Sequence, residues 1–167
     1  MEVSLRRFTA SDVATKVRWI NDPRNNEFLH YNIPLEEEKT ALWFESVKDR
    51  LDRYDAVIEA DGVPVGLIGL LQIDDKNKKA EYYISMGEDS YKRKGIASKA
   101  SGLIIEYAFD VLGLSKIYLN VDSENIAACT LYEKLGFVCE GEFKKDLWHR
   151  GRFVDRKRYA LMKPEAR

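Results

Sequence analysis

Apolar residues in the first part of the chain recur at two different periods. Alternating apolar positions predict a strand over residues 3–8, and residues 9–12 then carry a hydroxyl and a carboxylate at the spacing of a helix capping box. Val13, Val17 and Ile20 follow at i, i+4 and i+7, which places the three side chains on one face of a helix. The chain therefore opens with a strand and a short amphipathic helix.

A second helix is predicted after the next loop. Pro34 suits a first helical turn, and the three glutamates at 36–38 complement the positive end of the helix dipole. Trp43, Val47 and Leu51 recur at helical spacing. We therefore expect a helix that begins near Pro34 and has these three side chains on its apolar face.

Strand signals fill the middle of the chain. Residues 56–60 and 63–68 are rich in aliphatic side chains and flank an Asp-Gly pair, which favours a hairpin turn because glycine accepts positive φ. A polar turn at 74–78 leads to another β-rich segment at 80–86. The two segments around the Asp-Gly pair are therefore expected to form antiparallel strands.

The longest periodic segment starts at Gly95 and stops at Gly113, the residue type expected just beyond a helix C-terminus. Its apolar side chains recur at helical spacing, at Ile96, Ala100, Leu103, Ile104, Tyr107 and Val111. The remaining elements are predicted as a strand at 116–121, a helix from about 124 to 135, and strands near 137–143 and 153–162. This segment is therefore the main helix of the predicted fold.

The order of elements mixes hairpins with crossover connections, and no internal repeat or linker interrupts it. A length of 167 residues suits one hydrophobic core, and 45% hydrophobic with 33% charged residues is typical of a globular chain. We therefore predict a single domain, residues 1–167, of the α/β (α+β) class. Its central sheet is expected to be mixed, mainly antiparallel, and flanked by helices.

Composition narrows the function classes. The longest apolar runs, such as 63–71, hold fewer than ten residues, whereas a membrane helix needs about 20. The N-terminus lacks the pattern of an export signal, so we expect a cytoplasmic protein with no membrane partner. A net charge of -1 predicts no overall attraction to nucleic acid. Two cysteines and two histidines without close pairing predict no metal cofactor.

Residues 90–98, between a predicted strand and the longest helix, are candidates for binding an anion. Backbone N–H groups at a helix N-terminus are free, and a glycine such as Gly95 lets an anion approach closely. Lys92, Arg93 and Lys94 add positive charge. The segment matches neither the Walker nor the Rossmann glycine pattern. The alternative is an ordinary capped helix with solvated cations, although cations at a helix start are unfavourable to its dipole.

Two motifs in this order resemble the GNAT superfamily of acetyltransferases. Lys92-x-x-Gly95-x-Ala97 is similar to the Gln/Arg-x-x-Gly-x-Gly/Ala motif with which those enzymes bind the pyrophosphate of coenzyme A. Residues 125–137 are similar to the family segment Asn-x-x-Ala-x-x-Leu-Tyr-x-Lys-x-Gly-Phe. Further matches at Gly141, Trp148, Gly151 and Asp155 resemble the branch of ribosomal-protein alanine and spermidine acetyltransferases. Lys92 departs from the family pattern, which the backbone-based cradle should tolerate.

The resemblance implies acetyl-CoA as cosubstrate and assigns residues to it. Asn125 would bind the pantetheine arm, although an asparagine at this point also suits a helix N-cap. The remaining residues expected to contact the coenzyme lie on the strand and helix start before and after the glycine, at Ile84, Lys92, Arg93, Lys94, Gly95, Ile96, Ala97 and Ser98.

The resemblance also implies two catalytic residues. Glu81 lies on the predicted strand at a position where many family members have a general base; its alternative is an exposed carboxylate. Tyr132 matches the general acid that protonates the departing thiolate, a task that suits a phenol protonated at neutral pH. The alternative for Tyr132 is an aromatic side chain packed on an amphipathic helix.

The acceptor is expected to be a primary amine of a peptide N-terminus or a small metabolite. Residues 21–38 hold five acids against Arg24, which favours a polyamine, whereas residues 143–158 hold seven cations against two acids, which favours a nucleotide-linked amino sugar. The segment from 21 to 45 also resembles amino-sugar acetyltransferases. A non-catalytic acyl-CoA sensor, a nucleic-acid-binding domain on residues 143–158, and a homodimer remain alternatives.

Overall fold

The computed structural model describes residues 1–165, in which seven strands form one sheet of order β1-β2-β3-β4-β5-β7-β6. The strands are β1 (Val3–Arg7), β2 (Tyr54–Ala60), β3 (Val63–Asp74), β4 (Lys79–Met86), β5 (Lys116–Asp122), β6 (Val138–His149) and β7 (Arg152–Met162). The α-helices are α1 (Val13–Asn21), α2 (Glu37–Val47), α3 (Ile96–Glu106) and α4 (Ile126–Lys134). The last two residues of the predicted domain, 166 and 167, lie outside the described residues.

The sheet confirms the predicted mixed, mainly antiparallel architecture. Within residues 1–165, β4 and β5 form the one parallel pair, and every other neighbouring pair is antiparallel. The Asp61-Gly62 turn joins β2 to β3, with both residues at positive φ, as its sequence predicts.

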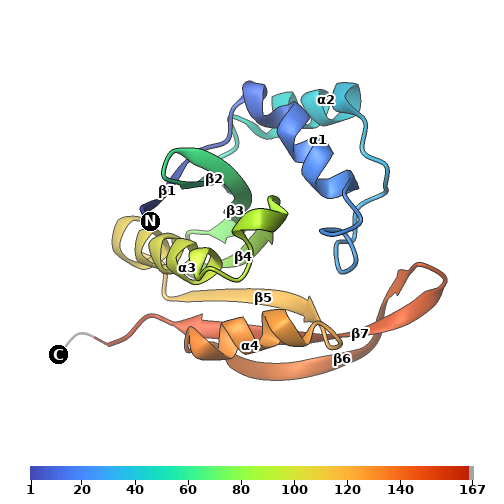
Figure 1. The fold of residues 1–167 in the computed structure, drawn as a ribbon. Helices are drawn as coiled ribbons and strands as arrows, with labels where there is room; N and C mark the ends of the chain where they lie inside the picture. The colour runs from blue at the N-terminus through green and yellow to red at the C-terminus, as the bar shows by residue number, and fades with distance from the viewer. Residues whose placement is uncertain (166–167) are drawn as a thin grey trace.

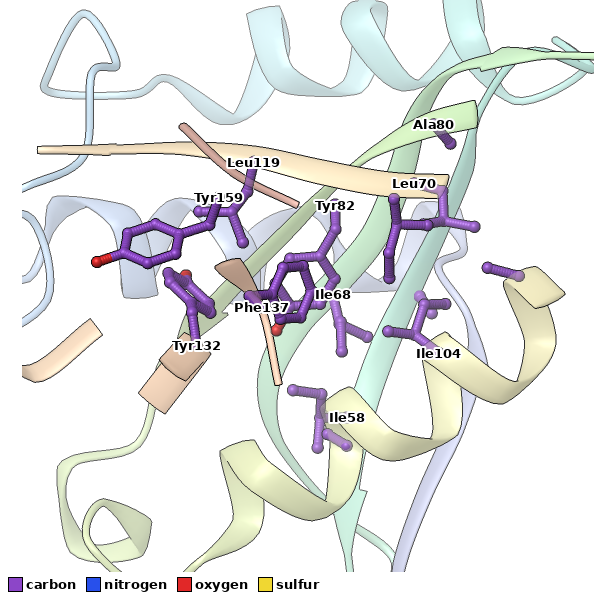
Figure 2. Close-up of a cluster of buried hydrophobic side chains, with 14 of the residues drawn as sticks. Ile58, Ile68, Leu70, Ala80, Tyr82, Ile104, Leu119, Tyr132, Phe137 and Tyr159 are labelled. Carbon is purple, nitrogen blue, oxygen red and sulfur yellow. The ribbon is translucent and has the colours of Figure 1, made fainter. Parts of the chain in front are cut away.

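Helices cover both faces of the sheet (Figure 1). One apolar cluster gathers the side chains of α3 and α4 with one face of the strands, among them Ile104, Tyr82 and Tyr132, and Figure 2 shows these rings and aliphatic side chains in contact range of one another. A smaller cluster around Phe8, Trp19 and Leu67 lies beneath α1 and α2. Successive side chains of β4 therefore point alternately into the two clusters.

The pair β4–β5 is short, and this is the feature that opens the sheet. Among the described residues its ladder holds three pairs, from Lys79–Lys116 to Glu81–Tyr118. Beyond Glu81 and Tyr118 the two strands continue to Met86 and Asp122 without pairing to each other. The facing edges of the two strands are therefore free of each other over their second halves.

Two details of the predicted second helix are wrong. Helix α2 begins at Glu37, and Pro34 lies in the loop before it, so the acids rather than the proline start the helix. Leu51 is 95% exposed in the turn after the helix, and it belongs to no buried stripe. Helical spacing alone did not reveal that the helix had already ended at Val47.

The main helix also ends differently from its pattern. Helix α3 stops at Glu106 and continues as a π-helical turn, Tyr107–Val111, before Gly113 at φ 67°. Ile96, Ala100 and Ile104 are buried as the pattern predicts, but Val111 is 70% exposed. The wider π turn shifts the apolar face, which explains why the last residue of the stripe reaches solvent.

The C-terminal hairpin is longer than predicted and reaches the loop between α1 and α2. Strand β6 extends to His149, six residues past its expected end at residue 143. Near the tip, Arg150 donates from Nη2 to the Oδ1 atom of Asn26 at 2.8 Å, and a ring nitrogen of His149 lies 3.0 Å from the Glu27 carbonyl. In Figure 1 the β6–β7 hairpin curves toward that loop.

Candidate active site

A cavity of about 870 Å³ opens where β4 and β5 separate. Its walls come from the free halves of these strands, the start of α3, the first turns of α4 and the loop between α1 and α2. Several residues predicted to carry the chemistry contribute to this wall: Glu81, Ile84, Lys92, Arg93, Ala97, Asn125 and Tyr132. The tertiary fold therefore brings both proposed catalytic residues and five of the nine proposed coenzyme contacts to one cavity.

The turn before α3 is shaped for an anion. Gly95 is the N-cap of the helix at φ 77°, and a Cβ atom built on it would meet nothing within 4 Å. Arg93 also has positive φ, at 62°. The first backbone N–H groups of a helix have no intrahelical partner, so this turn presents free amides and the positive end of the dipole toward open space.

The segment before the turn is held against α1. A Cβ atom at Gly87 would lie 2.1 Å from the Trp19 ring, so only glycine allows this contact. The Glu88 carboxylate accepts hydrogen bonds from the Trp19 indole at 2.8 Å and from Arg18 at 2.9 Å. These contacts fix the entrance of the turn, and they hold the pKa of Glu88 below its usual range, the Trp19 bond being the largest cause.

The predicted anion-binding residues do not all face the cavity. Lys92 donates from Nζ to the Asn25 side chain at 2.6 Å and to the Arg24 carbonyl at 3.0 Å, so its ammonium ties the turn to the α1–α2 loop. Ile96 is 2% exposed and packs in the main core, which leaves only its backbone amide for a ligand. Lys94, Gly95 and Ser98 contribute no side chain to the cavity wall.

Asn125 is the N-cap of α4, which was the alternative interpretation of this residue. Its Oδ1 atom accepts a hydrogen bond from the Ala128 backbone N–H at 3.2 Å, which makes it the N-cap of α4. It also lines the cavity. The cap uses the side-chain oxygen, and the side-chain Nδ2 group donates no hydrogen bond to any described residue.

Tyr132 combines a packed ring with a hydroxyl that has no hydrogen-bond partner among residues 1–165. Its ring stacks edge-on to Tyr82 with centroids 6.0 Å apart and contacts Phe137 at 5.8 Å (Figure 2). Burial raises the pKa of Tyr132 above its ordinary value of 10, and nearby Cys129 adds to the increase. A phenol that is buried, neutral and unpaired at a cavity wall can donate its proton to a group that gains negative charge.

Glu81 is the last residue of β4 that pairs with β5. Its backbone is paired with Leu71 of β3 and Tyr118 of β5, and its half-buried side chain lines the cavity. No ion pair to Glu81 forms within the described part of the chain. A carboxylate at the point where the strands separate can accept a proton there.

An Asp–His pair in the wall of the cavity was not predicted. The Asp122 carboxylate at the end of β5 is 6% exposed and lies 2.7 Å from Nε2 of His30 on the α1–α2 loop. The His30 ring also stacks edge-on to His149, with centroids 4.4 Å apart. The two histidines are 119 residues apart in sequence, so no local signal could have joined them.

The two charged segments predicted to flank the acceptor differ in their position relative to the cavity. None of the seven cations between residues 143 and 158 belongs to the wall of the cavity described within residues 1–165. Of the acids in the α1–α2 loop, Glu27 lines it, while Asp22 is bound by Arg24. The cavity is also lined by Lys16 and Tyr31, which the sequence analysis did not single out, and by Trp43, which it predicted only as an apolar residue of the second helix.

Residues 1–165 contain no cluster of metal-ligand side chains and no helix that could cross a membrane. No group of three or more histidine, cysteine or acidic side chains in this range is arranged to hold a metal ion, and the predicted lack of a metal cofactor stays a prediction. None of the helices formed by these residues has the length and apolar character needed to cross a membrane.

Comparisons with known proteins agree with this geometry. Residues 2–138 match the family of acetyltransferase (GNAT) domains. The spermidine N(1)-acetyltransferase of Escherichia coli (strain K12) is 34% identical over 147 residues, which cover 78% of each chain. The corresponding enzyme of Vibrio cholerae is 30% identical over 163 residues, covering 96% of this chain and 93% of that one.

A putative ribosomal N-acetyltransferase of Bacillus subtilis is 32% identical over 117 residues, covering 69% of this chain and 62% of that one. Among solved structures, the Vibrio cholerae spermidine N-acetyltransferase in complex with CoA and spermine matches with a TM-score of 0.89 at 27% identity, covering 96% of this chain and 95% of that chain. These relatives confirm the branch that the sequence motifs indicated. The protein is an N-acetyltransferase and belongs to the GNAT acetyltransferase family.

Proposed function

We propose that the protein transfers an acetyl group from acetyl-CoA to a primary amine of a small metabolite or a peptide N-terminus by direct attack on the thioester. The observation that supports this proposal is that Glu81, Tyr132 and residues at both ends of the turn before α3 line one cavity, which opens where β4 separates from β5. The rest of the proposal assigns a role to each group in that wall.

The residues present fit the coenzyme. The turn from Arg93 to Ala97 offers backbone amides to a diphosphate, and Gly95 leaves the approach open. The unpaired edge of β4 near Ile84 offers main-chain groups to an extended amide-bearing arm. When bound, acetyl-CoA supplies the activated acyl group. Lys92 is proposed to act indirectly, because its ammonium is bound to the α1–α2 loop.

The chemical steps need one proton acceptor and one proton donor. An alkylamine with a pKa near 10.4 is mostly protonated at neutral pH, so it must lose a proton before its lone pair can attack. We assign this proton to the Glu81 carboxylate, directly or through water. The Tyr132 hydroxyl then donates to the sulfur that leaves as a thiolate. The amine nitrogen gains the acyl bond as the carbon–sulfur bond breaks, and the second proton that it loses on becoming an amide returns to the Tyr132 phenolate through water.

A polyamine is the second candidate acceptor. It is favoured by the relatives, which are spermidine acetyltransferases, and by Glu27 and Glu81 in the cavity wall. It is opposed by Lys16 and Arg53 in the same wall. A nucleotide-linked amino sugar gains no support from the C-terminal hairpin, because the cations there lie outside the wall described above.

Release of free thiol from acetyl-CoA, measured with a panel of primary amines, tests the proposal. The panel contains amino acids, a peptide, amino sugars and polyamines. Thiol release that depends on the amine, together with an acetylated product found by mass spectrometry, is the expected result. Tight binding of acetyl-CoA without release for any amine would instead support an acyl-CoA sensor.

The homodimer also stays a proposal. Strand β6 is at the edge of the sheet and exposes Val138 and Trp148, which are 68% and 65% exposed. Edge strands with exposed apolar side chains favour pairing with another chain. Sedimentation of the purified protein at several concentrations measures this; a monomer at every concentration would exclude the dimer.

A further inference from the structure

Lys16 on α1 is a buried cation that the proposed reaction does not use. It is 7% exposed, and its side chain is surrounded by aromatic rings. Its Nζ atom lies 3.6 Å from the centroid of the Trp43 ring, 5.6 Å from that of Tyr31 and 5.9 Å from that of Phe8. Such contacts attract an ammonium group to the faces of the rings.

The ammonium of Lys16 is not neutralised by a carboxylate. No ion pair or hydrogen bond joins it to any side chain within residues 1–165. The acid whose charge raises the pKa of Lys16 is Asp55. The Asp55 carboxylate is already bound by both Arg53 Nε at 2.8 Å and Arg53 Nη2 at 2.9 Å, and it accepts a further bond from the Tyr83 hydroxyl at 2.5 Å. The Lys16–Arg53–Asp55 group therefore keeps one net positive charge.

The uncompensated charge belongs to the wall of the cavity that holds the proposed chemistry. Lys16, Trp43 and Tyr31 line the main cavity and also a smaller one of about 410 Å³ next to α2. Glu81 and Tyr83 point to the same face of β4 and lie about 7 Å apart along the strand. The Tyr83 hydroxyl donates to Asp55, the carboxylate that acts on Lys16, so the Lys16 group adjoins Tyr83 in the cavity wall.

We propose that Lys16 is the anion-binding residue of the acceptor site, so that the preferred acceptor is a primary amine that also carries a carboxylate or phosphate. The inference rests on the proposed function and adds the substrate class. A buried charge without a partner is unfavourable, and an anionic oxygen would supply that partner. A polyamine would instead bring a second ammonium toward Lys16, which like charges disfavour.

The protonation state of Lys16 supports this role at neutral pH. Burial lowers the pKa of Lys16 to about 8, with Asp55 opposing and Arg53 adding to the decrease. At pH 7 the group is therefore still mostly an ammonium. It can form a charge-assisted hydrogen bond with an anion, a type of bond that contributes roughly 10- to 100-fold in affinity.

Matched acceptors test the proposal with the full-length protein. At one spacer length we compare four primary alkylamines that end in a carboxylate, a phosphate, a neutral amide or a second amine, and repeat this at several lengths. The expected result is a kcat/KM roughly 10- to 100-fold higher for an anionic acceptor than for the amide. The better of the carboxylate and phosphate compounds identifies the anion. Equal values for anionic and neutral acceptors, or preference for the diamine, would overturn the proposal.

Two variants separate charge from packing. Lys16→Met keeps an unbranched apolar side chain among the rings, and it should lower kcat/KM for the anionic acceptors until it equals that for the neutral amide. Lys39→Met is the matched control, since Lys39 also lines the smaller cavity but is mostly exposed and pairs with Glu36. If Lys16→Met lowers kcat/KM equally for all acceptors, Lys16 is only a packing residue. If this variant does not fold, the wild-type ratios alone decide; thiol release from no amine at all would instead refute the proposed function.

Discussion

Removal of one oxygen atom, in Tyr132→Phe, tests the proposed acid most directly. The Tyr132 hydroxyl has no hydrogen-bond partner among residues 1–165, so the variant keeps the ring contacts with Tyr82 and Phe137. A positioned general acid contributes about 10²- to 10⁴-fold to the rate, which corresponds to about 3–5 kcal/mol of activation free energy. We expect kcat to fall by this factor, while the free energy of unfolding and the affinity for coenzyme A stay nearly unchanged.

Tyr82→Phe is the matched control for this prediction. The Tyr82 hydroxyl is buried and lies 2.6 Å from the Ser101 hydroxyl, which in turn donates to the Ala97 carbonyl. Loss of that bond should cost about 1 kcal/mol of stability without slowing turnover. Steady-state thiol release and urea unfolding of both variants give opposite signatures if the assignment is right. A Tyr132→Phe enzyme with turnover within twofold of wild type would refute the role of the phenol.

Three further changes test other parts of the site. Gly95→Asp should weaken coenzyme binding more than tenfold in calorimetry, because it adds negative charge and bulk to the turn before α3. Gly113→Asp is the control: Gly113 also has positive φ and open space around it, and its substitution should leave the affinity for the coenzyme unchanged. Glu81→Gln should lower kcat about 10²- to 10⁴-fold if the carboxylate is the base. Glu106→Gln, at an exposed position, is the control and should keep the wild-type kcat. Unaltered turnover of Glu81→Gln would mean that water, not Glu81, accepts the proton. Folding lowers the pKa of Lys16 from 10.5 to about 8, because burial disfavours its charged form. The contribution of Lys16 to the free energy of unfolding is therefore fully present above pH 10.5, and it is lost as the pH falls through 8. Wild-type stability should therefore rise by about 3 kcal/mol between pH 8 and 10.5 relative to Lys16→Met, and parallel pH profiles in urea unfolding would contradict this.

Local chemistry determined much of the fold and the candidate coenzyme turn from the sequence. The Asp61-Gly62 hairpin, the helix that starts at Gly95 and the glycine after it at Gly113 all depend on backbone angles that few residue types accept, so short segments reveal them. The predictions that failed lie where a local pattern continued past the element. Leu51 fits a helical spacing, but its helix ends at Val47.

Tertiary structure alone decided where the site opens and which charges face it. The separation of β4 from β5 after Glu81 depends on strand order across the whole sheet, which no segment encodes by itself. Lys16 lies one residue from Val17 on a helix whose charged side chains would be expected in solvent, yet packing of Trp43 and Tyr31 buries it. Long-range juxtaposition creates such groups because burial and pairing depend on neighbours that are distant in sequence. The family motifs therefore indicated the residues to which we assign the chemistry, and the assembled sheet and loops bring those residues to one cavity.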